Sequence, residues 1–408
     1  MRGTGRHGWA RTPVQKPGDG LRRRLDCGVP FVGRLPSMMP ETRGADGVSL
    51  MNVAVLGAGG GGLAVAYEWA SQGHRVSLYA QRAHNHHLAP VRERGGIRAE
   101  GVLEGFVPLQ TVTCDIAEAL QGVEVVFVVG PAYATEPFGA DTRGHLHPGM
   151  TVVVCPSSCV GSLAFKHAAG LGLYDQSIVV GETSTLPDAS RASRHASVRI
   201  FHRFDIGLSA AAAPRSNTPP LLGVLRQVYP NAEEAAGIFQ TTLQNGNPVI
   251  HPAVTLLNAA LIERTGGDFM FYEEGVTEAV GRVMKAVDDE RLAIARALGV
   301  AILAEPDLGV RQGYMTEPSY STGYSTAPGF RGIKAQNELH HRYLTEDVGY
   351  SMVFLSDLAR HLSVPIPTMD AVIRLASIVA DQDFAAERAR TMSNMGLSGL
   401  TREQLAAF

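Results

Sequence analysis

The chain has 408 residues, of which 45% are hydrophobic and 18% are charged, a length and balance that predict two domains with a buried core each. The formal net charge of −3 gives no indication of a nucleic-acid partner or an anionic membrane surface. No run approaches the roughly 18 apolar residues of a membrane span. The four cysteines form no CxxC pair, so we expect reduced thiols in a cytoplasmic protein.

The first 50 residues differ in composition from the rest of the chain. They hold eight Arg and one Lys against four acidic residues, and many Gly and Pro. No apolar segment follows the arginines as in a secretory signal, and the Gly and Pro residues interrupt any transit-peptide helix. We therefore expect residues 1–50 to be a disordered leader, or the product of a start codon assigned too far upstream. Met51 directly precedes the first strand-like run.

A strand, a glycine-rich turn and a helix are predicted after Met51. Residues 52–56 are apolar and β-branched, and the turn that follows satisfies the pattern G-x-G-x-x-G. In this pattern the first glycine permits a tight turn, the second lets the backbone approach a pyrophosphate, and the third lets the helix pack against the strand. The helix N-terminus offers free N–H groups to phosphates. The predicted cofactor-binding glycines are Gly57, Gly59, Gly60 and Gly62.

The choice between the two nicotinamide dinucleotides depends on the end of the second predicted strand, residues 75–79. NAD-binding proteins usually place an acidic residue there for the ribose 2′-hydroxyl. This chain has Ala80-Gln81-Arg82 instead, and Arg82 is suited to a bidentate contact with a 2′-phosphate. The sequence thus favours NADP(H), with NAD(H) as the alternative. The histidines that follow, at 84, 86 and 87, have no recognised metal-ligand spacing, and we predict no metal.

Further strand-like runs alternate with helical segments up to about residue 234. The runs 125–129, 151–155 and 178–180 are continuously apolar, as expected for parallel strands buried on both faces. Small residues follow each run, and Pro131 lies where a nicotinamide ribose would be. Residues 51–234 are therefore predicted to be a doubly wound α/β domain of the Rossmann type that binds a dinucleotide.

The pattern changes to helical periodicity from about residue 235. Helices are predicted over 276–298, 351–362 and 368–379, and residues 304–333 are predicted to be a long loop of the kind that often serves as a lid or binding segment. Residues 235–408 are thus predicted to be an all-α domain.

Two short motifs in this second half carry candidate chemistry. In the segment NGNPVIHP at 245–252, His251 lies between two prolines at the start of a predicted helix. In the segment RYLTEDV at 342–348, Arg342 and Asp347 lie five residues apart around another predicted helix start.

The combined motifs resemble the opine dehydrogenase family, which includes the octopine and nopaline dehydrogenases. The resemblance covers nearly all of 51–408 and implies a Rossmann domain followed by a helical domain. It is carried by GAGGGG at 57–62, GETSTLP at 181–187, NGNPVIHP at 245–252, NAALIE at 258–263, FMFYEEG at 269–275, ERLAIARALG at 290–299 and HRYLTEDV at 341–348. The chain departs from NAD-dependent relatives at the end of the second strand, where no acid is present.

The resemblance implies an oxidoreductase, monomeric or homodimeric, that condenses an amino acid with a 2-oxo acid through an imine and reduces the imine with NADPH. The family's His–Asp acid–base pair carries over to His251 and Asp347, and its anion-binding Arg to Arg342; we add Asn247, from the same motif as His251, as a substrate-binding residue. An imidazole titrates near neutral pH, and a carboxylate on its other nitrogen would orient it. Glu346 is a competing candidate for the carboxylate.

Two other functions remain open. The first is reduction of a simple ketone or 2-oxo acid, as in ketopantoate reductases and glycerol-3-phosphate dehydrogenases, which combine a similar Rossmann domain with a helical domain but typically use a lysine. The second is a non-catalytic NADP(H) sensor.

Overall fold

The computed structural model describes residues 50–193, 195–204 and 206–408. The expectation of a disordered or mis-assigned leader at 1–50 therefore falls, apart from Leu50, outside the described residues. The first strand begins at Asn52, directly after Met51.

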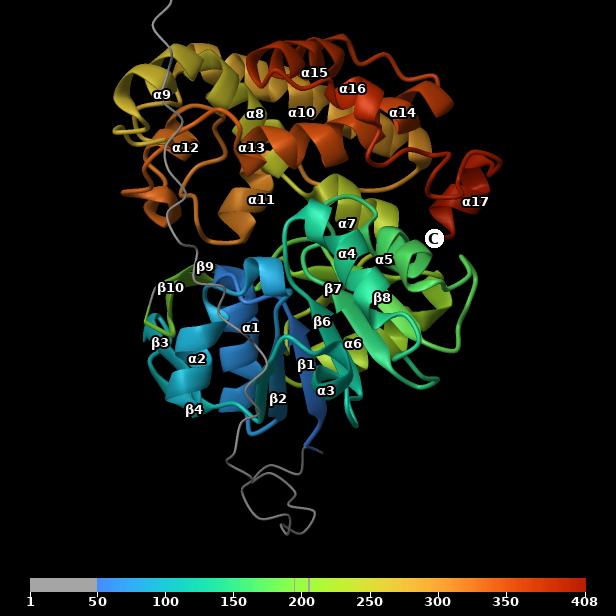
Figure 1. Ribbon diagram of the computed structural model, residues 1–408. Helices are drawn as coiled ribbons and strands as arrows, with labels where there is room; N and C mark the ends of the chain where they lie inside the picture. The colour runs from blue at the N-terminus through green and yellow to red at the C-terminus, as the bar shows by residue number, and fades with distance from the viewer. Residues whose placement is uncertain (1–49, 194, 205) are drawn as a thin grey trace, which may run out of the picture. The chain divides into compact units, whose positions relative to one another are not determined.

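An eight-stranded sheet organises the first half of the described chain (Figure 1). Its spatial order is β12-β11-β8-β7-β6-β1-β2-β5, and every neighbouring pair is parallel except β8 with β11. This arrangement confirms the predicted doubly wound α/β class. The strands are β1 (Asn52–Leu56), β2 (Arg75–Tyr79), β5 (Thr111–Thr113), β6 (Val125–Val128), β7 (Thr151–Val154), β8 (Val179–Thr183), β11 (Ser209–Ala212) and β12 (Glu233–Glu234).

Both faces of this sheet are covered by helices. Successive residues of β1 point to opposite faces: Val53 and Val55 join one apolar cluster, whereas Ala54 and Leu56 join another. The first cluster includes residues of α1 and α6, and the second includes residues of α3, α4 and α5. The helices of this half are α1 (Gly60–Ser71), η1 (Arg82–His84), α2 (Leu88–Arg94), α3 (Ile116–Ala119), α4 (Ala132–Thr142), α5 (Gly161–Ala169), η2 (Arg215–Asn217) and α6 (Thr218–Leu225).

A second, four-stranded sheet was not predicted from the sequence. Its order is β4-β3-β10-β9, formed by β3 (Gly96–Gly101), β4 (Gly105–Pro108), β9 (Asp188–Ala192) and β10 (Ser197–Arg203). The central pairing joins Ser197 to Arg98, so its strands come from distant parts of the sequence. Strand β9 packs against α1 at the glycine turn: a Cβ on Gly60 would lie 3.1 Å from the backbone nitrogen of Ala192.

The second half is helical, as predicted (Figure 1). Its main apolar cluster also includes Val160 and Leu163 at the start of α5, so the helices pack directly on the sheet-containing half. The helices are α7 (Ile238–Gln244), α8 (Asn247–Leu257), α9 (Ala259–Thr265), α10 (Glu278–Leu298), α11 (Glu305–Arg311), α12 (Thr322–Ser325), η3 (Pro328–Phe330), α13 (Arg342–Thr345), the π-helical η4 (Asp347–Met352), α14 (Val353–His361), α15 (Pro367–Val379), α16 (Phe384–Glu387) and α17 (Arg402–Ala406).

Helix α10 closely matches the helix predicted over 276–298, and the residues at its ends explain where it begins and ends. The Thr277 side chain accepts a hydrogen bond from the Val280 N–H at the start, and Gly299 ends the helix with a φ of +83°. The long loop predicted for 304–333 is wrong in part, because α11, α12 and η3 lie within it. Helix α11 has Pro306 in its first turn, where proline favours a helix instead of ending one.

No helix within the described ranges combines the length and the apolar character needed to cross a membrane.

Candidate functional site

The glycine turn between β1 and α1 has the geometry that a dinucleotide pyrophosphate needs. Gly57 has a φ of +124°, and a Cβ there would lie 1.9 Å from the Val129 carbonyl oxygen. A Cβ on Gly62 would lie 1.9 Å from the Gly57 carbonyl oxygen, so only glycine lets α1 approach β1 this closely. Gly59 is exposed, and a Cβ there would meet no atom within 4 Å. With no side-chain cap on α1, its first N–H groups face this open space, so these residues fit a dinucleotide.

The end of β2 presents both a cation and a carboxylate. Arg82 lies exposed in η1, directly after the strand. The Tyr79 hydroxyl and the Gln81 amide both donate to Asp141 Oδ2, at 2.8 and 2.7 Å. Asp141 comes from α4, so the sequence pattern around β2 gave no sign of it. A carboxylate therefore lies beside this position although the strand itself carries none.

The carboxyl end of β6 contacts the helical half. Pro131 precedes the first residue of α4, and the next N–H, of Ala132, donates to Glu346 Oε1 at 2.8 Å. Glu346 thus binds the start of α4 and does not pair with His251. This position of Glu346 joins the predicted nicotinamide region to the segment that carries Asp347.

His251 is buried between a carboxyl group and a hydroxyl group. Its Nδ1 lies 2.8 Å from Asp347 Oδ2 and its Nε2 lies 3.0 Å from the Tyr272 hydroxyl oxygen. The imidazole also stacks on the Tyr343 ring, with centroids 3.9 Å apart. His251 is 4% exposed and Asp347 2%. The structure therefore brings the two residues of the predicted pair together, and it adds Tyr272, to which sequence analysis assigned no role although it lies in the motif FMFYEEG.

Local helix geometry places these side chains. His251 lies in the second turn of α8, later than the predicted helix start, because α8 begins at Asn247 with Pro248 in its first turn. Asp347 begins the π-helical segment η4, which follows α13 and packs against α8. Such π turns occur frequently at functional sites.

Burial controls the ionisation of the pair. It lowers the pKa of His251 well below the usual value, and Arg342 lowers it further while Glu346 opposes. Burial raises the pKa of Asp347 to about 7, with Arg342 opposing. Burial also raises the pKa of Tyr272 well above 10, so this hydroxyl keeps its proton. A neutral imidazole therefore connects a hydroxyl to a carboxyl group, and a proton can pass along the three.

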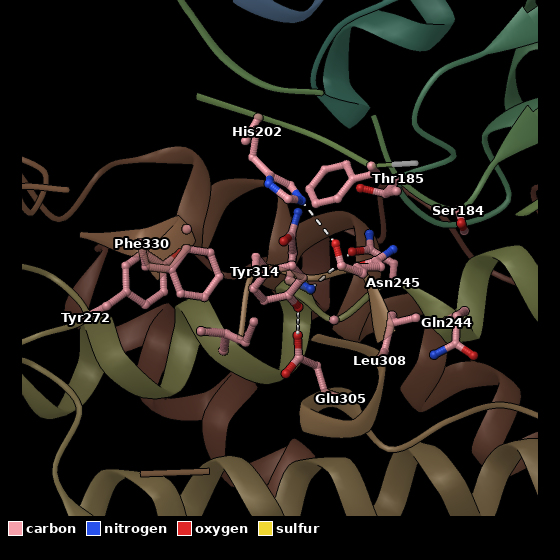
Figure 2. Close-up of a pocket in the computed structure, with 17 residues that line it drawn as sticks. Ser184, Thr185, His202, Gln244, Asn245, Tyr272, Glu305, Leu308, Tyr314 and Phe330 are labelled. Carbon is pink, nitrogen blue, oxygen red and sulfur yellow. Dashed lines mark hydrogen bonds between the residues drawn. The ribbon is translucent and has the colours of Figure 1, made fainter. Parts of the chain in front are cut away.

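A cavity of about 110 Å³ adjoins this hydrogen-bonded series of Tyr272, His251 and Asp347, which we call the relay (Figure 2). Tyr272 belongs to both, because its ring lines the cavity while its hydroxyl contacts His251. Asn247 lines the same cavity, and so do residues of the sheet-containing half such as Thr185 and His202. Neither Lys nor Arg is among its described lining residues.

Arg342 lies at a different cavity, of about 440 Å³, which Tyr133 and Tyr350 also line. Its side chain is 45% exposed, its Nη1 lies 3.6 Å from Glu346 Oε2, and its Cζ lies 5.1 Å from the Tyr343 ring centroid. The structure thus connects Arg342 to His251 through Tyr343 but does not place it in the cavity lined by Asn247.

Within the ranges that the structure describes, no three His, Cys, Asp or Glu side chains are close enough together to hold a metal ion.

Comparisons with known proteins relate both halves to dehydrogenases. Residues 234–380 match the model of the NAD/NADP octopine/nopaline dehydrogenase alpha-helical domain, and residues 52–157 match that of the NAD-dependent glycerol-3-phosphate dehydrogenase N-terminus. The chain is 33% identical to an opine dehydrogenase of Arthrobacter sp. (strain 1C), over 85% of this chain and 96% of the relative. It is 27% identical to the protein ocs of Agrobacterium tumefaciens (strain Ach5), over 86% and 96%.

Solved structures show the same fold. An octopine dehydrogenase superposes with a TM-score of 0.70 at 18% identity, covering 88% of this chain and 98% of the other. A yersinopine dehydrogenase superposes with a TM-score of 0.64 at 16% identity, covering 88% and 97%.

Proposed function

Because the chain belongs to the opine dehydrogenase family and is therefore an NAD(P)-dependent oxidoreductase acting on a CH–NH bond, we propose that His251, Asp347 and Tyr272 perform its acid–base chemistry. The family's reaction is the reductive condensation of an amino acid with a 2-oxo acid. The single observation that carries the proposal is the buried hydrogen-bonded series Tyr272–His251–Asp347 beside a cavity.

The condensation needs two proton movements before reduction. The amine nitrogen loses a proton to the ketone oxygen as it attacks, which gives the carbinolamine. The carbinolamine hydroxyl then gains a second proton as it leaves as water, and the nitrogen remains as an iminium. Tyr272 is positioned to give its hydroxyl proton to the leaving oxygen and to recover one from His251, which Asp347 orients. When bound, the reduced nicotinamide supplies the hydride that adds to the carbon of this iminium and gives the secondary amine. Burial of the relay excludes water, which would hydrolyse the imine.

We further propose that Asn247 contacts the substrate from the cavity wall and that Arg342 binds a substrate carboxylate from the second cavity. An amide side chain can donate to a substrate oxygen, and a half-exposed guanidinium can hold a carboxylate bidentately. With these roles, the two cavities would hold the two ends of a dicarboxylate product.

NADPH is the proposed reductant over NADH. Arg82 is exposed beside the end of β2, and Asp141 Oδ2 already accepts two hydrogen bonds. Solved relatives have been determined with NADH and with NADP+, so the family uses both.

Replacing Arg82 by Ala should raise KM for NADPH about 10-fold to 100-fold and leave KM for NADH nearly unchanged. The exposed Arg94 provides a matched control, and an equal change for both cofactors would contradict the assignment.

The experiment that tests the function is a matrix of 2-oxo acids, each with and without amino acids, in which NADPH and NADH oxidation is followed. We expect oxidation that depends on the amine and is lost in His251→Ala. Oxidation that ignores the amine would instead indicate reduction of a simple ketone, and cofactor binding without any turnover would indicate a sensor.

Three organisational expectations remain proposals. They are the division into a Rossmann domain over 51–234 and a helical domain over 235–408, a monomeric or homodimeric state, and a cytoplasmic location.

A further inference from the structure

Glu305 is the one carboxylate among the 17 described residues that line the cavity beside Tyr272 (Figure 2). It is the first residue of α11 and is 1% exposed. The other titratable groups of the lining are two tyrosines and His202, whose Nε2 contacts the Gln312 carbonyl oxygen. A buried carboxylate without a cation in the same cavity is costly unless something else compensates its charge.

Within the described residues, the protein provides a hydrogen-bond donor to only one of the two carboxylate oxygens of Glu305. The Tyr314 hydroxyl donates to Oε1 at 2.8 Å, whereas the buried Oε2 has no hydrogen-bond partner. The carboxyl group lies against the turn before α8, since a Cβ on Gly246 would lie 2.6 Å from Oε1. One oxygen is therefore satisfied by the fold and the other is left without a donor.

Arg291, a buried cation near Glu305, already has other hydrogen-bond partners. Arg291 Nε lies 2.6 Å from Asp288 Oδ1, and its other nitrogens donate to the carbonyl oxygens of Leu243 and Leu303. Asp288 adds a second negative charge close to Glu305, whose backbone N–H it accepts. Burial, with Asp288 adding to it, raises the pKa of Glu305 to about 8. The group would ionise readily only if a positive charge arrived from the cavity.

Aromatic rings complete the surroundings. Phe330 stacks on Tyr272 with centroids 4.0 Å apart and lies 4.9 Å from the Tyr314 ring, and Phe204 lies 6.1 Å from Tyr314. Figure 2 shows Tyr272 and Phe330 side by side and Glu305 directed toward Tyr314. Aromatic faces together with a carboxylate are the chemistry that binds ammonium and guanidinium groups.

We propose that Glu305 is the amine-binding carboxylate of the site: its free oxygen receives a protonated nitrogen of the amino-acid substrate, within an aromatic surround formed by Phe204, Tyr272, Tyr314 and Phe330. The inference rests on the proposed function and goes beyond it by naming the residue that selects the amino donor. The nitrogen is either the α-ammonium group, common to all amino acids, or a cationic side chain. In either case the bound nitrogen would lie in the cavity whose wall includes the Tyr272 ring.

The test uses the full chain with Glu305→Gln and three donors that differ in side-chain charge or polarity: the cationic L-arginine, its neutral isostere L-citrulline, and the apolar L-norleucine. We expect the variant to raise donor KM at least about tenfold, with KM for the 2-oxo acid and the cofactor unchanged. An equal loss for all three donors assigns the α-ammonium group, and a loss confined to arginine assigns the side chain. Glu338→Gln, at an exposed acid, is the matched control.

Direct calorimetric titration of each donor into wild type and variant separates this inference from the proposed reaction, because binding needs no turnover. Glu305→Asp keeps the charge and should recover part of the donor affinity that Glu305→Gln loses. Unchanged donor affinity in Glu305→Gln, equal affinities in the Asp and Gln variants, an equal effect on the 2-oxo acid, or no binding of any donor to the wild type would each overturn the inference. If wild-type protein binds a donor but shows no turnover, the result would instead contradict only the proposed reaction.

Discussion

Replacing Asp347 by Asn tests the relay most directly. The carboxylate lies 2.8 Å from His251 Nδ1 with both side chains at most 5% exposed. At an effective dielectric constant of about 20, an ionised carboxylate at this distance stabilises an imidazolium that forms transiently during proton transfer by roughly 4–6 kcal/mol. The amide keeps the shape and one hydrogen bond, but it removes the charge and can reverse the tautomer. We expect kcat to fall about a thousandfold, which corresponds to ~4 kcal/mol.

The assay is amine-dependent NAD(P)H oxidation, with cofactor binding followed by fluorescence and folding by circular dichroism. Both binding and folding should be retained, because Asp347 hydrogen-bonds to His251 of α8, and neither residue belongs to the glycine turn or the sheet. Asp289→Asn, at a 56% exposed carboxylate paired with Lys285, is the matched control and should behave as wild type. A kcat within fivefold of wild type in Asp347→Asn would refute the reasoning.

Three further predictions concern the structure around the site. Arg390 is fully buried and donates to three main-chain carbonyls and one carboxylate, so Arg390→Met should lower the free energy of unfolding in urea by about 3–5 kcal/mol, and a loss below 1 kcal/mol would contradict this. Gly62→Ala places a Cβ 1.9 Å from a carbonyl oxygen and should abolish NAD(P)H binding in fluorescence titrations, whereas Gly223→Ala, with no atom within 4 Å, should bind normally. The pKa of Glu305 is about 8 in the folded state and near 4.5 in the unfolded chain, so the unfolded state releases its proton first and wild type loses stability between these pH values. Glu305→Gln should therefore gain stability relative to wild type by up to roughly 1.4 kcal/mol per pH unit from pH 5 to 8 in urea unfolding, and parallel curves would exclude a buried acid of this kind.

Much of the architecture could be predicted because its signals are local. The strand, glycine turn and helix at 52–71 are adjacent in sequence, and each residue type matches a backbone requirement within a few positions. Helix α10 likewise has its signals within its own segment: apolar residues at helical spacing, the Thr277 cap at its start and Gly299 at its end. Where periodicity was weak, prediction failed: residues 304–333 were predicted to be a loop, but α11 begins at Glu305 with Pro306 in its first turn.

The four-stranded sheet lacked such signals. Its strands are short, several of their side chains are exposed, and β10 pairs with β3 from about a hundred residues earlier. Nothing within either strand specifies that partner, because the pairing joins segments that are distant in sequence and both contact α1.

The same distinction applies to the candidate site. Motif resemblance indicated His251 and Asp347, which lie 96 positions apart in the chain, but the 2.8 Å contact depends on the packing of α8 against η4. Residue types and short spacings thus determined the fold class, and the resemblance of the motifs to a known family gave the chemical candidates. The Tyr272 hydroxyl on His251, the separation of Arg342 from the cavity and the free oxygen of Glu305 were decided by tertiary packing, since burial and unsatisfied hydrogen bonds exist only after distant helices meet.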